Sequence, residues 1–121
     1  MSVPETIEID GVRFVKAESE QEVASGLECV IARARDAGVF VGYLQEESAD
    51  TNRVVLRNAR RLWYWAGAAT LSQLSQEGVK LPDQCKFPRE VPHVVLFNVC
   101  ELLPVTQVAK ASIDKVKVWE K

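Results

Sequence analysis

Apolar and polar residues alternate in three short segments between residues 27 and 59, and turn residues separate these segments. An Asp-Ala-Gly turn at residues 36–38 joins the first two segments, and a polar run at residues 48–52 joins the second and third. A period of two is typical of β-strands, and consecutive short strands usually pair with their neighbours. The pattern therefore predicts an antiparallel sheet, in which Gly42 marks a bend or a bulge.

A short helix is expected after the third strand. Thr70 is a residue type that favours the N-cap, and Gln73 follows it at the capping-box spacing. Leu71 and Leu74 then share one face, and Gly78 predicts the end of the helix.

The later part of the chain adds a loop, a strand and a second helix. Residues 79–92 contain three prolines and are expected to form a loop. Residues 93–104 are mostly apolar, which predicts one long strand covered on both faces. Helical spacing predicts a second short helix over residues 106–115, with an apolar face formed by Val108, Ala111 and Ile113.

The two terminal segments have separate predictions. Ile7 and Ile9 precede a central Asp-Gly pair and Val12 and Phe14 follow it, which predicts a hairpin. We therefore expect residues 1–26 to form an N-terminal hairpin extension, with a helical turn or linker at 18–26, and residues 27–121 to form the β-rich core domain. Residues 116–121 are expected to be a short strand or an extended tail.

This order of elements predicts an α+β fold that is mainly β. Two architectures fit: a bent antiparallel sheet, or a small barrel of the SH3-like or Sm-like kind, in either case with an inserted short helix. A barrel would remove the exposed edges that an open sheet leaves. The pattern alone does not determine a function.

Charge is unevenly distributed along the 121 residues. The net charge is −2, but residues 1–28 carry seven acidic and two basic side chains, whereas residues 53–61 carry four arginines and no acid. A local positive field can therefore exist on an acidic protein. The sequence shows neither a signal peptide nor an apolar run of about 20 residues, so we expect a soluble, cytoplasmic protein without membrane contact.

The three cysteines, Cys29, Cys85 and Cys100, do not form a recognisable motif. Their odd number and the lack of C-x-x-C spacing argue against a disulfide framework and a zinc site, and favour reduced, mostly buried thiols. A nucleophilic pair between a cysteine and His93, the only histidine, stays open because such pairs are defined by spatial geometry. We assign no catalytic residue, metal or cofactor, and consider an enzyme the weaker reading.

The segment 58–65, Asn-Ala-Arg-Arg-Leu-Trp-Tyr-Trp, is the best candidate for a binding site. Arginine offers a planar fork of donors that matches phosphate, and indole rings offer faces on which a nucleobase stacks. No phosphate-loop, dinucleotide or RNA-binding signature accompanies the segment. The candidate ligand-binding residues are Arg33, Arg35, Arg57, Asn58, Arg60, Arg61, Trp63 and Trp65.

Two other interpretations of the same segment stay open. Large aromatic side chains dominate small cores, so the three aromatic residues could close the interior. Aromatic residues and arginine are also enriched in protein interfaces, so the segment could bind a partner or a second copy. Three consecutive aromatic residues cannot all face the same way, and the sequence does not decide which of Trp63, Tyr64 and Trp65 is exposed.

Several stretches resemble a family of small uncharacterised proteins that is common in phage and prophage genomes. The resemblance covers roughly residues 27–119 and leaves the N-terminal extension outside. Its most specific part is the motif N-A-R-R-L-W-Y-W-x-G-A-A-x-L-S-Q-L, which begins at Asn58. The family has no assigned activity, so the resemblance implies an origin rather than a mechanism. A phage protein of this size could interfere with host defence signalling or serve as a packaging or virion accessory.

These observations lead to one expected function and one alternative. We expect a phage or prophage accessory protein that acts in the host cytoplasm and binds, as a homo-oligomer and without turnover, a small phosphate-bearing nucleotide such as a host defence signal. Extended nucleic acid is a weaker ligand because duplex binding usually needs a broad basic footprint. The alternative is a protein-interaction or virion-associated module that uses the aromatic cluster as its interface.

Overall fold

The computed structural model describes residues 7–9, 12–14 and 26–121. Strands β1 (Ile7–Ile9) and β2 (Val12–Phe14) pair antiparallel, so the predicted hairpin is confirmed. Its Asp-Gly turn and most of the helical turn or linker expected at 18–26 lie outside the described residues.

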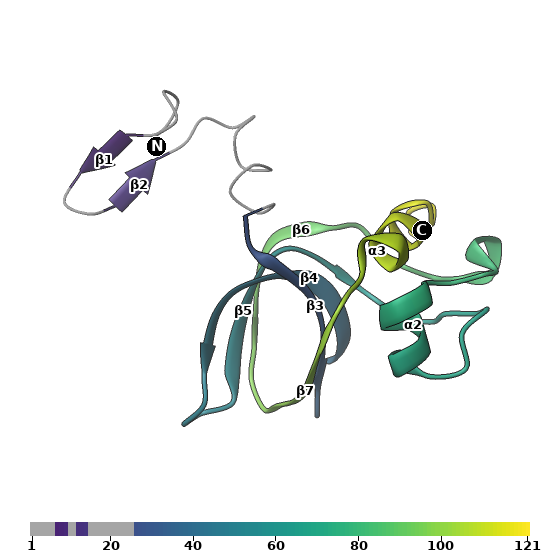
Figure 1. Cartoon of the computed structure of the whole chain (residues 1–121), viewed down its shortest axis with the longest axis horizontal. Coiled ribbons are helices and arrows are strands. Elements are labelled where there is room, and N and C mark those ends of the chain that lie inside the picture. The colour runs from purple at the N-terminus through teal and green to yellow at the C-terminus, as the bar shows by residue number, and fades with distance from the viewer. Residues whose placement is uncertain (1–6, 10–11, 15–25) are drawn as a thin grey trace.

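Five antiparallel strands form the main sheet, in the order β6-β5-β4-β3-β7 (Figure 1). The expected α+β, mainly β fold is confirmed. Within residues 26–121 the sheet is accompanied by two short α-helices and by one 3-10 turn, η2 (Pro82–Gln84), which lies in the predicted loop. The strand bounds are β3 (Glu28–Ala34), β4 (Gly38–Ser48), β5 (Arg53–Arg61), β6 (Val91–Leu96) and β7 (Val99–Pro104).

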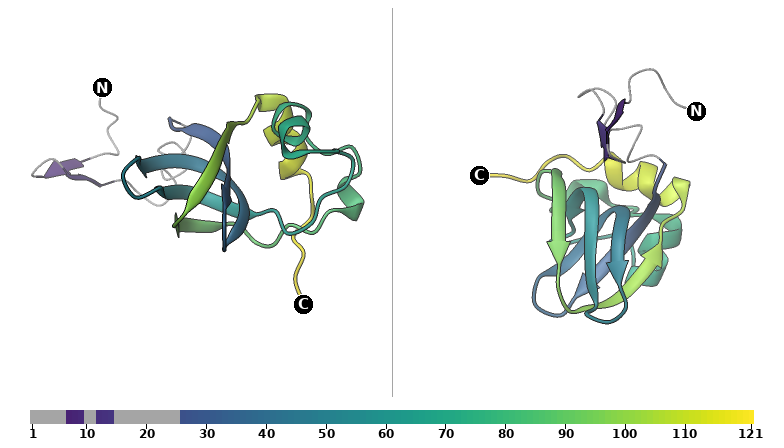
Figure 2. Two further views of the ribbon diagram at one scale, coloured as in Figure 1. Left: turned by 90° about the horizontal axis from the view of Figure 1, so that it is seen from below. Right: turned by 90° about the vertical axis from the view of Figure 1, so that its left-hand side faces the viewer.

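The sheet is strongly bent because its two edge strands are consecutive in the chain. Only Phe97 and Asn98 separate β6 from β7, which lie at opposite edges. The curl brings three turns together: the Arg35 amide donates to the Asn98 carbonyl at 3.0 Å, and the Val99 amide donates to the Asn52 carbonyl at 2.9 Å. Within residues 26–121 no ladder joins β6 to β7, so the bent open sheet is the architecture observed, rather than a closed barrel (Figure 2).

The prediction of a single long strand over residues 93–104 is wrong. The apolar run is two strands that belong to opposite edges of the sheet, and most of their side chains are half-buried or exposed rather than covered on both faces. Asn98 interrupts the run with a φ of 57°, a left-handed conformation that asparagine tolerates better than most residues. Because valine and leucine lie on both sides of Asn98, the hydrophobic pattern does not reveal the break.

Gly42 lies at a β-bulge, as the sequence predicts. The register between β4 and β5 shifts between Val41 and Tyr43, and the extra residue on β5 is Asn58, whose φ is 49°. A Cβ on Gly42 would lie 3.1 Å from the backbone of Ala59. The missing side chain therefore lets the bulged strand approach closely.

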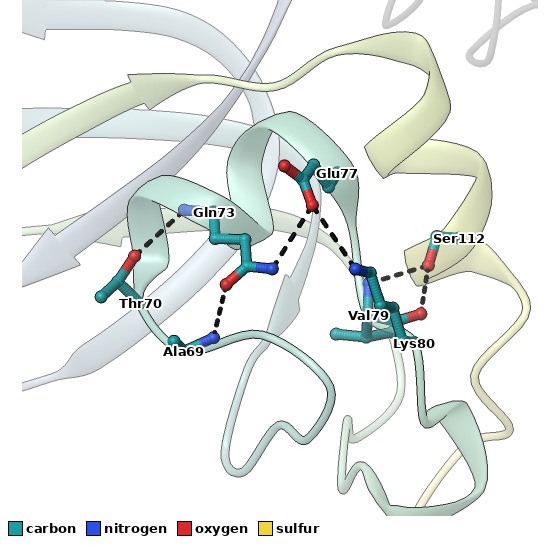
Figure 3. A network of polar contacts seen from close by, with 7 residues as sticks. All are labelled: Ala69, Thr70, Gln73, Glu77, Val79, Lys80 and Ser112. Atoms are coloured by element: carbon teal, nitrogen blue, oxygen red, sulfur yellow. Dashed lines mark hydrogen bonds and ion pairs between the residues drawn. The ribbon is translucent and has the colours of Figure 1, made fainter.

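Helix α2 (Leu71–Glu77) begins and ends where the sequence predicts. The Gln73 amide donates to the Thr70 hydroxyl at 3.1 Å, while the Gln73 side-chain oxygen accepts from the Ala69 amide at 2.8 Å (Figure 3). The reciprocal bond thus reaches one residue before the N-cap of an ideal capping box. Gly78 ends the helix with a φ of 82°.

Helix α3 (Gln107–Asp114) is also confirmed, but its buried face differs from the expected one. Ala109 and Ile113 are fully buried, whereas Val108 is 70% exposed and Ala111 is exposed as well. The helix starts at Gln107 with Thr106 as its N-cap, and this phase directs the 109–113 row toward the sheet. The expected face was therefore wrong at Val108 and Ala111 and right at Ile113.

Each face of the sheet is covered by its own apolar cluster. The outer cluster lies between the sheet and the two helices and contains Ile31, Val41, Leu74, Phe87 and Ile113. The inner cluster fills the concave face of the curl, with members that include Val30, Ala32, Phe40, Leu56 and Ala59. Strand β3 contributes alternate residues to the two clusters, so both of its faces carry apolar side chains. Its sequence alternates between apolar and polar residues only near the C-terminal end of the strand.

Arg60 connects β5 to the elements that cover the outer face. Its guanidinium donates to the carbonyls of Pro88 (2.8 Å), Phe87 (3.1 Å), Ile113 (3.1 Å) and Val116 (2.7 Å). The side chain is 8% exposed, and burial lowers the pKa of Arg60 from its ordinary value while leaving it cationic. The cation also lies at the C-terminus of α3, where the helix dipole favours positive charge.

Replacing Arg60 with alanine should lower the free energy of unfolding by roughly 3 kcal/mol or more, because four carbonyls lose a charged donor inside the protein. Arg60→Lys should rescue little, since one ammonium cannot reproduce the fork. Urea unfolding followed by circular dichroism measures both effects. Arg61→Ala, at the exposed neighbouring position, is the matched control and should change the midpoint little. Equal stabilities of the Arg60 and Arg61 variants would contradict the assignment.

Candidate functional site

A groove opens between the turn joining β3 to β4 and the segment that leaves β5. We call it the tryptophan groove. Its volume is about 450 Å³, which is within the range of small-molecule sites. It is lined by Ala37, Gly38, Val39, Arg61, Leu62, Trp63 and Trp65. Three of the eight predicted ligand-binding residues therefore meet here, and they come from one short segment.

Arg61 provides the positive charge of the tryptophan groove. Its guanidinium lies over the Phe40 ring, with 4.3 Å between the central carbon and the ring centroid, and it donates to the Ala37 carbonyl. This is the only hydrogen bond that the guanidinium makes within residues 26–121. The residue is exposed, so the remaining N–H groups are available to an anion in the groove.

The two indole rings of the groove have different environments. Trp63 is 60% exposed, whereas Trp65 is half-buried and packs against the outer cluster. Trp119 braces Trp63 from the side, with ring centroids 6.3 Å apart and planes at 81°. More than half of Trp63 is thus exposed, so part of its ring is accessible to a ligand.

The C-terminal residues that carry Trp119 are attached to the segment before β6. The Trp119 amide donates to the Phe87 carbonyl at 3.0 Å, and Val118 forms a parallel bridge with Phe87. The Lys86 ammonium lies 5.7 Å from the Trp119 ring centroid. The tail is therefore extended, as the sequence predicts, and it contributes to the position of Trp63.

A second hollow, which we call the turn groove, lies where the three turns of the curled sheet meet. Its volume is about 480 Å³. It is lined by Arg33, Ala34, Arg35, Gly38, Val39, Asn52, Asn98, Val99 and Cys100. It shares Gly38 and Val39 with the tryptophan groove, so the two hollows are neighbours around one turn.

The two arginines of the turn groove differ in their partners. The Arg33 Nε atom is 2.9 Å from the Glu101 carboxylate, and this hydrogen bond raises the pKa of Arg33. Arg35 is exposed and has no ion pair within residues 26–121. Arg35 is therefore the cation of this hollow that can most readily accept an anion.

The remaining predicted residues lie outside both hollows. Arg57 stands between Tyr43 and His93 in the register, half-buried, and its Nε atom has no hydrogen-bond partner within residues 26–121. Asn58 donates to the Glu90 carboxylate at 3.0 Å. The Arg60 guanidinium is buried and donates to backbone carbonyls.

The register shows which arginines share a face of the sheet. Arg33, Arg57 and Arg60 lie on the outer face, whereas Arg61 pairs with Phe40 on the opposite face. Arg35 follows the end of β3 and belongs to no strand. Arg57 pairs with Tyr43, and Tyr43 pairs with Cys29, which is four residues from Arg33 on β3. Arg57 is therefore two strands and four residues away from Arg33, so the Cα atoms of Arg33 and Arg57 are well over 10 Å apart. The arginines of the outer face therefore do not form one continuous patch.

The thiols and the histidine are distributed apart. Cys29 and His93 occupy the same cross-strand row, but β4 and β5 separate them, which places their backbones roughly 14 Å apart. Cys85 is buried and contacts the backbone of Ala66. Cys100 is exposed at the turn groove. The strand order thus keeps Cys29 and His93 beyond hydrogen-bond reach.

Burial raises the pKa of the Cys29 thiol to about 11, and the positive charge of Lys110 only partly opposes this effect. The thiolate is the reactive species, so Cys29 should be modified by iodoacetamide at pH 8 far more slowly than the exposed Cys100. Mass spectrometry of timed samples measures the order of labelling. Faster modification of Cys29 than of Cys100 in the folded protein would contradict this environment.

Within the described residues, no group of three or more histidine, cysteine, aspartate or glutamate side chains is arranged to hold a metal ion. No helix in the same part of the chain is both long enough and apolar enough to cross a membrane.

Comparison with known proteins assigns the chain to a family. A family model described as "Domain of unknown function (DUF6948)" matches residues 27–113. The chain belongs to this family. No curated protein and no solved structure is significantly similar to it. The match covers both grooves but ends before Trp119.

Sequence reasoning did not identify Trp119, Asn52 or Asn98 as neighbours of the candidate site. Trp119 reaches Trp63 only through the pairing of the tail with Phe87, and no local pattern indicates that pairing. Asn52 and Asn98 are turn residues with positive φ, which their residue type could have suggested. Their convergence depends on the curl of the sheet.

Trp119→Ala should disturb Trp63 more than Trp65, because the Trp63 ring packs against the Trp119 ring at 6.3 Å between centroids. In a ¹H–¹⁵N spectrum the variant should lose one indole signal, shift that of Trp63 and leave that of Trp65 nearly in place. Trp119→Phe retains an aromatic edge and serves as the control. An unshifted Trp63 signal in the alanine variant would show that the brace has no effect.

Proposed function

We propose that this protein binds a small phosphate-bearing nucleotide in the tryptophan groove without chemical turnover. One observation carries the proposal: an exposed indole, Trp63, and an incompletely partnered guanidinium, Arg61, line the same groove. The phosphate would lie on Arg61 and the base would stack on Trp63. Arg35 and Arg33 would contribute from the neighbouring hollow.

The chemistry of the groove favours a nucleotide over a purely apolar ligand. Stacking of a base on an aromatic ring contributes about 1–3 kcal/mol, and a guanidinium forms bidentate hydrogen bonds with phosphate. Ala37, Gly38 and Val39 form an apolar wall that suits a flat ring. The acidic pI near 5.5 disfavours extended nucleic acid, which needs a broad basic surface, but it does not oppose a ligand held in one pocket.

The biological setting belongs to the same proposal. The motif that begins at Asn58 resembles proteins of phage and prophage genomes, so we infer an accessory protein that acts in the host cytoplasm. Binding without turnover would then sequester the ligand, such as a host defence signal. We include a homo-oligomer in the proposal because the exposed Trp63 and Tyr64 offer the aromatic surface that protein interfaces favour.

The test is titration of the purified protein with AMP, GMP, ADP, cyclic mononucleotides and dinucleotides, followed by tryptophan fluorescence and calorimetry. Trp63 is exposed, so a stacked base should quench its emission. Silence of both signals across the panel at high micromolar concentrations would refute the proposal. The ratio of absorbance at 260 and 280 nm gives an independent check, because a co-purified nucleotide raises it.

Arg61→Ala should weaken binding of the responding nucleotide about tenfold or more, since a hydrogen bond to a charged group contributes about 1.5–3 kcal/mol. Lys80→Ala removes one positive charge at an exposed position outside both grooves and should leave the affinity unchanged. Equal affinities of the two variants would exclude Arg61 from the site.

A second candidate function is a protein-interaction or virion-associated module. It is favoured by the exposure of Trp63 (60%), Tyr64 (50%) and Val118 (43%), which lie around the pairing of Tyr64 with Lys86 and of Val118 with Phe87. Light scattering of the Trp63→Ala and Tyr64→Ala variants distinguishes the two functions. Loss of an oligomer or of a captured partner without loss of nucleotide binding would favour the second.

A further inference from the structure

We infer that the ligand carries two phosphate groups separated by a nucleoside, as in a linear or cyclic dinucleotide, and that it extends around the β3–β4 turn. This inference rests on the proposed function and specifies its ligand class. The tryptophan groove and the turn groove each have a volume of roughly 450–480 Å³ and share two lining residues, Gly38 and Val39. A ligand in one hollow can therefore reach the other without crossing a separate wall.

The strand register sets the scale of the combined site. Val39 on β4 pairs with Arg33 on β3, and the next residue, Phe40, pairs with Arg61 on β5. The positions of Arg33 and Arg61 are thus two strand spacings apart, roughly 10 Å along the sheet. They also lie on opposite faces of the sheet, so a ligand that contacts both hollows must curve around the rim. A flexible phosphodiester-linked molecule can do this, whereas a mononucleotide fills only one hollow.

Each hollow holds one cation that is free of an ion pair within residues 26–121. Arg61 lines the tryptophan groove, and Arg35 lines the turn groove. Arg33 is neutralised by Glu101, which also faces this region. The exposed Asp36 follows Arg35 in the chain and reduces the local potential, so Arg35 should bind phosphate through directed hydrogen bonds more than through long-range attraction.

The ridge between the hollows is low because it is formed by Gly38. The residue has a φ of +95°, and a Cβ placed on it would meet only the Arg61 guanidinium within 4 Å, at 3.8 Å. The space above Gly38 is therefore open toward solvent and bordered by a cation. Asn52 and Asn98 add side-chain amides on the far side of the turn groove, where they can donate to a second phosphate or a base edge.

The experiment compares AMP, ADP and 5′-phosphorylated diadenylate by calorimetry. ADP carries two adjacent phosphates, whereas the dinucleotide carries two that are separated by a nucleoside. We expect the dinucleotide to bind at least tenfold more tightly than either mononucleotide. Arg35→Ala should reduce dinucleotide affinity to about the AMP level while changing AMP affinity less than twofold, and Arg61→Ala should weaken all three. Lys80→Ala is the matched charge control.

The outcomes separate this inference from the proposed function. If AMP binds and the dinucleotide binds no better, or if Arg35→Ala weakens both ligands equally, the two-phosphate site is refuted and nucleotide binding stands. If GMP or a cyclic mononucleotide binds and none of these three probes does, the two-phosphate site is refuted and nucleotide binding stands. If neither these probes nor the other nucleotides of the panel bind to protein whose circular dichroism is unchanged, both proposals are refuted. Circular dichroism of each variant ensures that lost binding is not lost folding.

Discussion

The buried guanidinium of Arg60 is the contact on which the arrangement of this protein depends. The two helices are too short to fold alone. These helices and the long loop after β5 have few hydrogen bonds with the sheet other than those of Arg60. One planar fork gathers carbonyls from two distant segments, 87–88 and 113–116, at the point where β5 ends. The position of the following segment, which carries Trp63 and Trp65, is thereby fixed relative to the β3–β4 turn.

The curl of the sheet produces the second half of the candidate site. Two residues are too few to connect the opposite edges of a flat five-stranded sheet, since the edge strands would lie roughly 19 Å apart. The sheet must therefore bend until the turns at Arg35, Asn52 and Asn98 meet. The same constraint creates the inner apolar cluster and the turn groove, so the groove is a direct result of chain connectivity.

Local patterns predicted local features well. The three strands between residues 28 and 61, the hairpin, the bulge at Gly42 and the cap of α2 all depend on residues that are close in sequence. The division of residues 93–104 was missed because it depends on one asparagine within an apolar run. The sequence does not show which face of β5 is buried, because the consecutive apolar residues Val54, Val55 and Leu56 are all buried and do not alternate with polar ones. The candidate site was predicted by residue type, but its two hollows depend on pairings that span most of the chain.

Arg60 and Arg61 are identical neighbours in the printed sequence, yet they belong to different parts of the molecule. Successive residues of a strand point to opposite sides, so one guanidinium is built into the framework and the other remains at the surface. Among members of the family, the first arginine should vary only together with the segments whose carbonyls it holds. If Arg61 binds the ligand as proposed, the second arginine can diverge freely, which would let one scaffold acquire new ligands without rebuilding its interior.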